Sequence, residues 1–173
     1  MIKVGTGWQS EFPNDQGVRK SIVRDGGQVT VASFKSLTGG HSMMYLEFID
    51  IMGFAVTRKI HLLAGPNGIE IEDQETEVNQ ESDCRANDYY YKSYTLTDAQ
   101  RAGVEAAALR FKAKNANGRY TYRLAGGTIG RLTTRPKTRG VNCADFVIKV
   151  LDEAGVTRIK SKIFNTPARI AGH

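Results

Sequence analysis

The chain has 173 residues, of which 40% are hydrophobic and 24% are charged, a composition typical of one globular domain with its own core. No stretch approaches the roughly 18 apolar residues of a membrane-spanning helix, and the N-terminus lacks the apolar core of a signal peptide. We therefore expect no transmembrane segment, and a protein made in the cytoplasm and not exported through a cleaved signal.

The net charge of +6 is unevenly distributed. Residues 101–173 carry 15 Lys and Arg against 4 Asp and Glu, whereas residues 1–100 carry 9 against 14. Such asymmetry fits either a surface for an acidic partner, such as nucleic acid, or two halves whose solvated surfaces attract each other. Few aromatic residues lie among the basic ones, which favours the second interpretation and makes nucleic acid an unexpected partner.

Alternating and β-branched runs predict a series of strands that are separated by turn residues. The second and third of these strands are joined by a tight turn around Asp50–Gly53. The predicted strands span residues 28–34, 41–49, 54–63 and 68–72, with 88–94 and 119–124 as further candidates. Segments 10–27, 73–88 and 125–140 are expected to be loose.

The first predicted helix follows Thr97, which forms a Thr-x-x-Gln capping box with Gln100. Its apolar residues recur at helical spacing and predict one buried face. That face consists of Val104, Ala107, Ala108 and Phe111.

The second predicted helix follows Asn142, a favourable N-cap, and ends before Gly155. Its buried stripe consists of Phe146, Val147, Val150, Leu151 and Ala154.

Cys143 is the first residue of this second helix. Unpaired N–H groups and the positive end of the helix dipole stabilise a thiolate there, so we expect a lowered pKa and a nucleophile. The alternative is a structural cysteine, because cysteine is among the most buried residue types. Cys84 and Cys143 are expected to be free thiols, and no spacing typical of zinc ligands is present, so we predict no metal site and no cofactor.

A catalytic cysteine needs a base, and His41 is the best candidate among three histidines. It follows a glycine pair at the start of a strand, where it could face the helix that begins with Cys143. If a three-residue loop at 50–52 joins strands 41–49 and 54–63, His61 lies opposite His41 and could orient it. The alternative is an exposed strand histidine beside Lys59.

Two reserve candidates for this third catalytic role are Glu47 and Thr57. The last histidine, His173, is the final residue and is expected to fray.

The Gly-Gly-His strand start, the polar residue on the neighbouring strand and the segment "NCADFV" at a helix start resemble a circularly permuted papain-like enzyme. This is the His-before-Cys form of the NlpC-type superfamily, which includes the lecithin:retinol acyltransferase-like branch. The segment "YTLTDAQRAGVEAAALRF" followed by "NCADFVIKVLDEAGV" is similar to bacterial type VI secretion effectors. The resemblance covers residues 28–156.

The resemblance implies an α+β fold in which an antiparallel sheet packs against the catalytic helix. It implies one papain-like domain over residues 1–173, with a core at about 28–156. Cys143 would be the nucleophile, His41 the base and His61 the third member. The gap of 102 residues between His41 and Cys143 is longer than a compact permuted core needs.

The segment 125–140 runs directly into Asn142 and Cys143. We expect Arg131 and Arg139, together with Asn142, to bind substrate, because guanidinium groups attract the carboxylates of a peptide stem or the phosphates of lipids. The alternative is a solvated basic loop that only leads into the helix.

Three functional classes follow. The first is a cysteine hydrolase of amide bonds. The resemblance implies that such an enzyme would be a secreted antibacterial toxin that acts on peptidoglycan. It would be delivered into target cells by a specialised system and paired with an immunity protein. The second is a lipid acyltransferase or esterase that uses the same cysteine and histidine. The third is a non-enzymatic basic module that binds nucleic acid or an acidic protein.

Overall fold

The structure is a computed structural model. This structure describes residues 2–4, 7–9, 26–34, 40–66, 68–77, 84, 89–123, 139–157 and 167. Near the N-terminus, β1 (Ile2–Val4) and β2 (Gly7–Gln9) form a short antiparallel pair.

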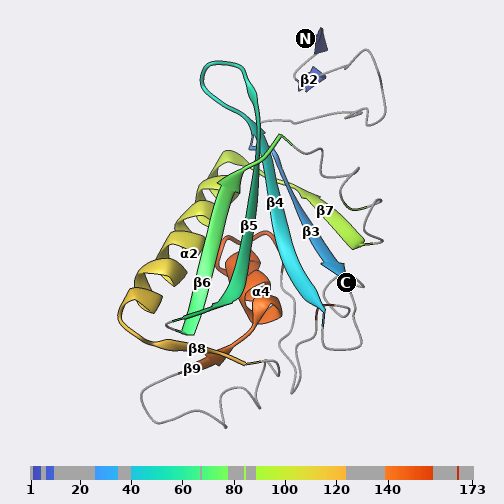
Figure 1. The fold of residues 1–173 in the computed structure, drawn as a ribbon. Coiled ribbons are helices and arrows are strands. Elements are labelled where there is room, and N and C mark those ends of the chain that lie inside the picture. The colour runs from blue at the N-terminus through green and yellow to red at the C-terminus, as the bar shows by residue number, and fades with distance from the viewer. Residues whose placement is uncertain are drawn as a thin grey trace.

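Five antiparallel strands form the main sheet, in the order β6-β5-β4-β3-β7 (Figure 1). The strands are β3 (Gln28–Phe34), β4 (His41–Ile49), β5 (Ala55–Gly65), β6 (Gly68–Glu75) and β7 (Tyr90–Thr95). Two helices, α2 (Asp98–Ala116) and α4 (Cys143–Glu153), pack against it, and the parallel pair β8 (Tyr120–Tyr122) and β9 (Arg139–Val141) leads into α4. The expectation of an α+β fold with helices on an antiparallel sheet is confirmed.

The two faces of the sheet differ in what covers them. On one face, the two helices and the sheet bury a large core, whose sheet residues include Val31, Met44, Leu46, Ile60 and Leu62. On the other face lies a smaller cluster of Ala32, Met43, Tyr45 and Cys84, with Phe34 and Tyr89 packed against it. Alternation along β4 therefore assigns Met44 to the helix face and Met43 to the opposite face.

Most predicted strand positions are confirmed, and 28–34 and 41–49 match residue for residue. The expectation that residues 73–75 are loose is wrong, because β6 continues to Glu75 and pairs with β5 as far as Arg58. Of the other segments expected to be loose, 10–25 and 125–138 lie outside the described residues, whereas residues 139 and 140, also expected to be loose, belong to β9.

Both helices begin as the sequence predicts. Thr97 and Gln100 form the capping box of α2, and Asn142 and Asp145 form that of α4. The predicted buried faces are confirmed for both helices, except that Ala154 is only partly buried, and Gly155 follows α4 at a φ of +65°. Local capping thus fixes Cys143 at the start of a helix.

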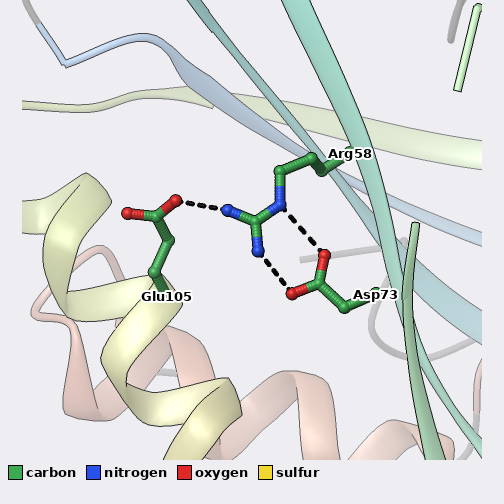
Figure 2. A network of polar contacts seen from close by, with 3 residues as sticks. All are labelled: Arg58, Asp73 and Glu105. Atoms are coloured by element: carbon green, nitrogen blue, oxygen red, sulfur yellow. Dashed lines mark hydrogen bonds and ion pairs between the residues drawn. The ribbon is translucent and has the colours of Figure 1, made fainter. Parts of the chain in front are cut away.

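An ion-pair network fastens α2 to the sheet (Figure 2). The Arg58 guanidinium from β5 binds the Asp73 carboxylate from β6 with both Nε and Nη2, and the Nε to Oδ1 distance is 3.0 Å. Its Nη1 donates to Glu105 of α2. The network therefore links two neighbouring strands to one helix and fixes the position of α2 against the sheet.

The β4–β5 turn differs from the three-residue loop assumed from the sequence. Ile49 pairs with Ala55, so five residues form the connection. The Asp50 carboxylate accepts hydrogen bonds from the backbone N–H groups of Met52 and Phe54, and Gly53 adopts a φ of +85°. The pairing is therefore shifted by two residues, which preserves the face on which each side chain lies.

Candidate active site

Cys143 is the first residue of α4, and its side chain is almost completely buried, with 1% exposed. The side chain of Asn142, the residue before it, accepts a hydrogen bond from the backbone N–H of Asp145 at 2.9 Å. This cap anchors the first helical turn and therefore the position of the thiol.

The Cys143 sulfur is surrounded by hydrogen-bond donors. These are the backbone N–H groups of Ser42, Ala144 and Cys143 itself, together with the Tyr122 hydroxyl. All of them favour the thiolate, but burial outweighs them and raises the pKa of Cys143. The expectation of a lowered pKa was wrong, because a helix terminus acts locally while desolvation depends on everything packed around the sulfur.

His41 and His61 lie on the same face of the sheet and are in direct contact. Met43 is the residue opposite His61, so His41 is its diagonal neighbour. The Nε2 of His41 lies 2.9 Å from the Nδ1 of His61. The shift in register made the pair diagonal instead of directly opposite, and it kept the two rings together.

The chain of contacts continues to β6. The Nε2 of His61 lies 2.9 Å from Oε2 of Glu72, the residue directly opposite it in the sheet. His41, His61 and Glu72 therefore form one hydrogen-bonded row across three adjacent strands.

Both histidines are held in the neutral form near neutral pH. Burial is the main cause that lowers the pKa of His41 to about 4, with further contributions from His61 and Lys59. Burial also lowers the pKa of His61, while the hydrogen bond and charge of Glu72 oppose this effect. A neutral imidazole can accept a proton, as a general base must.

The thiol meets the histidine row at the beginning of β4. Its contact with the Ser42 N–H places the sulfur beside the peptide that joins His41 to Ser42. Strand alternation puts the His41 ring on the face of Met43 and Tyr45, whereas α4 packs on the opposite face. The expectation that His41 faces α4 is therefore wrong, because the His41 ring and the sulfur lie on opposite faces of the sheet and meet only at the peptide at its end.

The remaining residues considered in the sequence are the predicted substrate-binding residues and His173. Asn142 is buried and caps α4, and Arg139 is half-buried in β9. Arg131 and His173 lie outside the described residues.

The two reserve candidates, Glu47 and Thr57, lie opposite each other in the sheet. Glu47 is six residues along β4 from His41, about 20 Å at 3.3 Å per residue, and accepts a hydrogen bond from Gln28. This position is remote from Cys143.

Glu72 and Tyr122 are not among the site residues predicted from the sequence. The segment Gly65-Pro66-Asn67-Gly68 could have revealed Glu72, because a two-residue turn there pairs residue 61 with residue 72. Tyr122 had no comparable signal. It reaches the thiol because β8 lies parallel to β9, which pairs Tyr122 with Val141, two residues before Cys143.

Comparisons with known proteins identify no relative. No family model matches the chain, and no curated protein or solved structure matches it significantly. In the described part of the chain, no three His, Cys, Asp or Glu side chains converge as metal ligands would. The described helices include none that is long and apolar enough to span a bilayer.

Proposed function

We propose that this protein is a cysteine hydrolase of amide bonds with a circularly permuted papain-like arrangement. Cys143 is the nucleophile, His41 the general base, and His61 the group that orients the base. The observation that carries this proposal is the hydrogen-bonded histidine row on β4, β5 and β6, which begins at the peptide that contacts the Cys143 sulfur.

The raised pKa of the thiol and the lowered pKa of His41 imply a resting pair of neutral groups. Because the sulfur and the His41 ring approach the end of β4 from opposite faces of the sheet, a water molecule at that end carries the thiol proton to His41 as the sulfur bonds to the substrate carbonyl carbon. Since Nε2 faces His61, we assign this proton transfer to Nδ1 of His41. The imidazolium returns the proton to the leaving nitrogen as the C–N bond breaks, and water activated by His41 hydrolyses the thioester.

The groups that surround the sulfur suit this chemistry. The N–H groups of Ser42 and Ala144 and the Tyr122 hydroxyl stabilise the thiolate as it forms. Burial raises the pKa of Tyr122 to about 12, with further contributions from its interactions with Cys143, so its hydroxyl keeps its proton and remains a donor.

The substrate we favour is a peptide amide of peptidoglycan, in a secreted antibacterial effector with a cognate immunity protein. The support for this identification is the resemblance of the segments around Gln100 and Cys143 to such effectors.

A lipid ester is less favoured because of where the apolar tip lies. Ile51, Met52 and Phe54 are strongly exposed in the β4–β5 turn, at the end of the sheet opposite β8 and β9 (Figure 1). His41 begins β4 and Ile49 lies eight positions further along the strand, about 26 Å at 3.3 Å per residue. If the exposed apolar residues of the β4–β5 turn entered a membrane, Cys143 and His41 would lie far from the lipid surface.

Purified peptidoglycan and phospholipid vesicles, each incubated with the protein, test the proposal. We expect new amino groups from peptidoglycan, their loss in Cys143→Ala, and wild-type release by Cys84→Ala, a matched change of the other buried cysteine. Fatty acid release from vesicles that depends on Cys143 would instead identify a lipid enzyme. Equal activity of Cys143→Ala and the wild type would refute the assignment of the nucleophile.

A further inference from the structure

We propose that Glu72 is a positioning residue that sets the tautomers of both histidines and so selects Nδ1 of His41 as the base. This inference rests on the proposed function for its catalytic meaning, but the tautomers themselves are independent of any activity. It follows from the row of two 2.9 Å contacts that ends on a carboxylate.

The direction of each hydrogen bond follows from the carboxylate. An ionised carboxylate only accepts hydrogen bonds, so Nε2 of His61 must carry a proton and donate it to Glu72. A neutral imidazole has one N–H, and His61 is neutral near neutral pH because burial lowers its pKa. Its Nδ1 is therefore an acceptor.

The tautomer of His61 then determines that of His41. Its Nε2 faces the Nδ1 acceptor of His61 and must donate the proton. Because the pKa of His41 is lowered to about 4, the ring is also neutral and its Nδ1 carries the lone pair. Nδ1 is thus ready to accept a proton from a thiol.

Without Glu72, the row can reverse. His61 could then carry its proton on Nδ1 and donate to Nε2 of His41, which would leave the proton of His41 on Nδ1 and remove the base. The Lys59 ammonium, the other nearby charge that affects both rings, lowers both pKa values and offers no acceptor. Glu72 is the group in this row that distinguishes the two arrangements.

The surroundings of Glu72 suit this role. Its side chain is 35% exposed, and that of His61 is 15% exposed. The carboxylate thus remains partly hydrated, while its hydrogen bond lies against a largely buried ring. Such an acceptor is known to fix the tautomer and orientation of a neighbouring imidazole.

Long-range proton–nitrogen correlation spectra of the 15N-labelled full chain at pH 7.5 test the inference. The chain has three histidines, so the variants His61→Gln and His173→Gln are sufficient to assign the rings. In the wild type we expect both His41 and His61 to be protonated on Nε2. Protonation of either ring on Nδ1 would overturn the proposal without any variant.

The variants separate Glu72 from a general effect of charge. Glu72→Leu should convert both rings from one tautomer to a mixture and lower the pKa of His61, whereas Glu72→Gln, which keeps an acceptor oxygen, should retain the wild-type tautomer. Glu70→Leu is the matched control, because Glu70 is exposed and lies two residues away on the same face of β6. Unchanged tautomers in a folded Glu72→Leu variant would refute the role of Glu72.

The spectra test the tautomer assignment and the hydrolysis assay tests the proposed function, so either claim can be refuted without the other. Nε2-protonated rings in a protein whose Cys143→Ala variant keeps full activity would leave the tautomer assignment correct and the proposed function wrong. An active, Cys143-dependent enzyme with Nδ1-protonated His41 would give the opposite result.

Discussion

Replacing His41 by glutamine should make the stability of the protein less dependent on pH between 4 and 6.5. In the folded protein, burial and the neighbouring His61 and Lys59 lower the pKa of His41 from 6.5 to about 4. In the unfolded chain the ring returns to its ordinary pKa. Between these two values, the unfolded state binds a proton that the folded state does not.

The sign and size follow from this difference. A depressed folded pKa gives stability that is fully present above pH 6.5 and is lost as the pH falls toward 4. At about 1.4 kcal/mol per pH unit, the difference corresponds to about 3 kcal/mol. Because the ring is partly exposed to solvent, we expect a loss of about 2 kcal/mol in the free energy of unfolding.

Urea denaturation at pH 4.5, 5.5 and 7.5, followed by circular dichroism, measures this effect. The free energy difference between the wild type and His41→Gln should change by about 2 kcal/mol from the highest to the lowest pH, with the wild type losing more stability on acidification. His173→Gln controls for the loss of any one histidine. A difference between the wild type and His41→Gln that stays constant with pH would show that His41 is not buried as a neutral ring.

Three further outcomes are expected. Iodoacetamide should modify Cys143 slowly at pH 7 and faster at alkaline pH, because burial raises its pKa, and Tyr122→Phe should slow the reaction further by removing a donor to the thiolate; rapid modification at pH 6 would contradict this. Asn142→Ala should reduce the free energy of unfolding by about 1 kcal/mol through loss of the helix cap, and Asn142→Asp should restore most of it. Arg58→Ala should lower the free energy of unfolding by about 1–2 kcal/mol, because it leaves two partly buried carboxylates unpaired. Arg110→Ala, which removes an exposed ion pair, should lower it by less than about 0.5 kcal/mol. Equal losses in the two variants would exclude a structural role for the network in Figure 2.

The local elements of this protein could be predicted from the sequence because their signals are local. The capping boxes at Thr97 and Asn142 depend on residues within one helical turn. The alternation of the strand that begins at His41 needs only its own residues. Placing a cysteine at the start of a helix was therefore possible without any tertiary information.

The pairing of His41 with His61 was predicted with the correct face but the wrong register. A turn of five residues, closed by the Asp50 carboxylate, replaced the assumed loop of three. Because side chains in a strand alternate with a period of two, this two-residue shift kept both rings on one face. The two rings therefore still meet, as diagonal neighbours joined by a hydrogen bond.

Only the tertiary structure decided the electrostatics and the full extent of the site. The pKa of Cys143 depends on how much of the molecule covers the sulfur, and the surrounding strands and helices determine this burial. Tyr122 reaches the thiol through the parallel pairing of β8 with β9, and Glu72 joins the row because the register of β5 with β6 places it directly opposite His61. Desolvation and long-range strand pairing are sums over residues distant in sequence, so no local pattern around Cys143 could contain them.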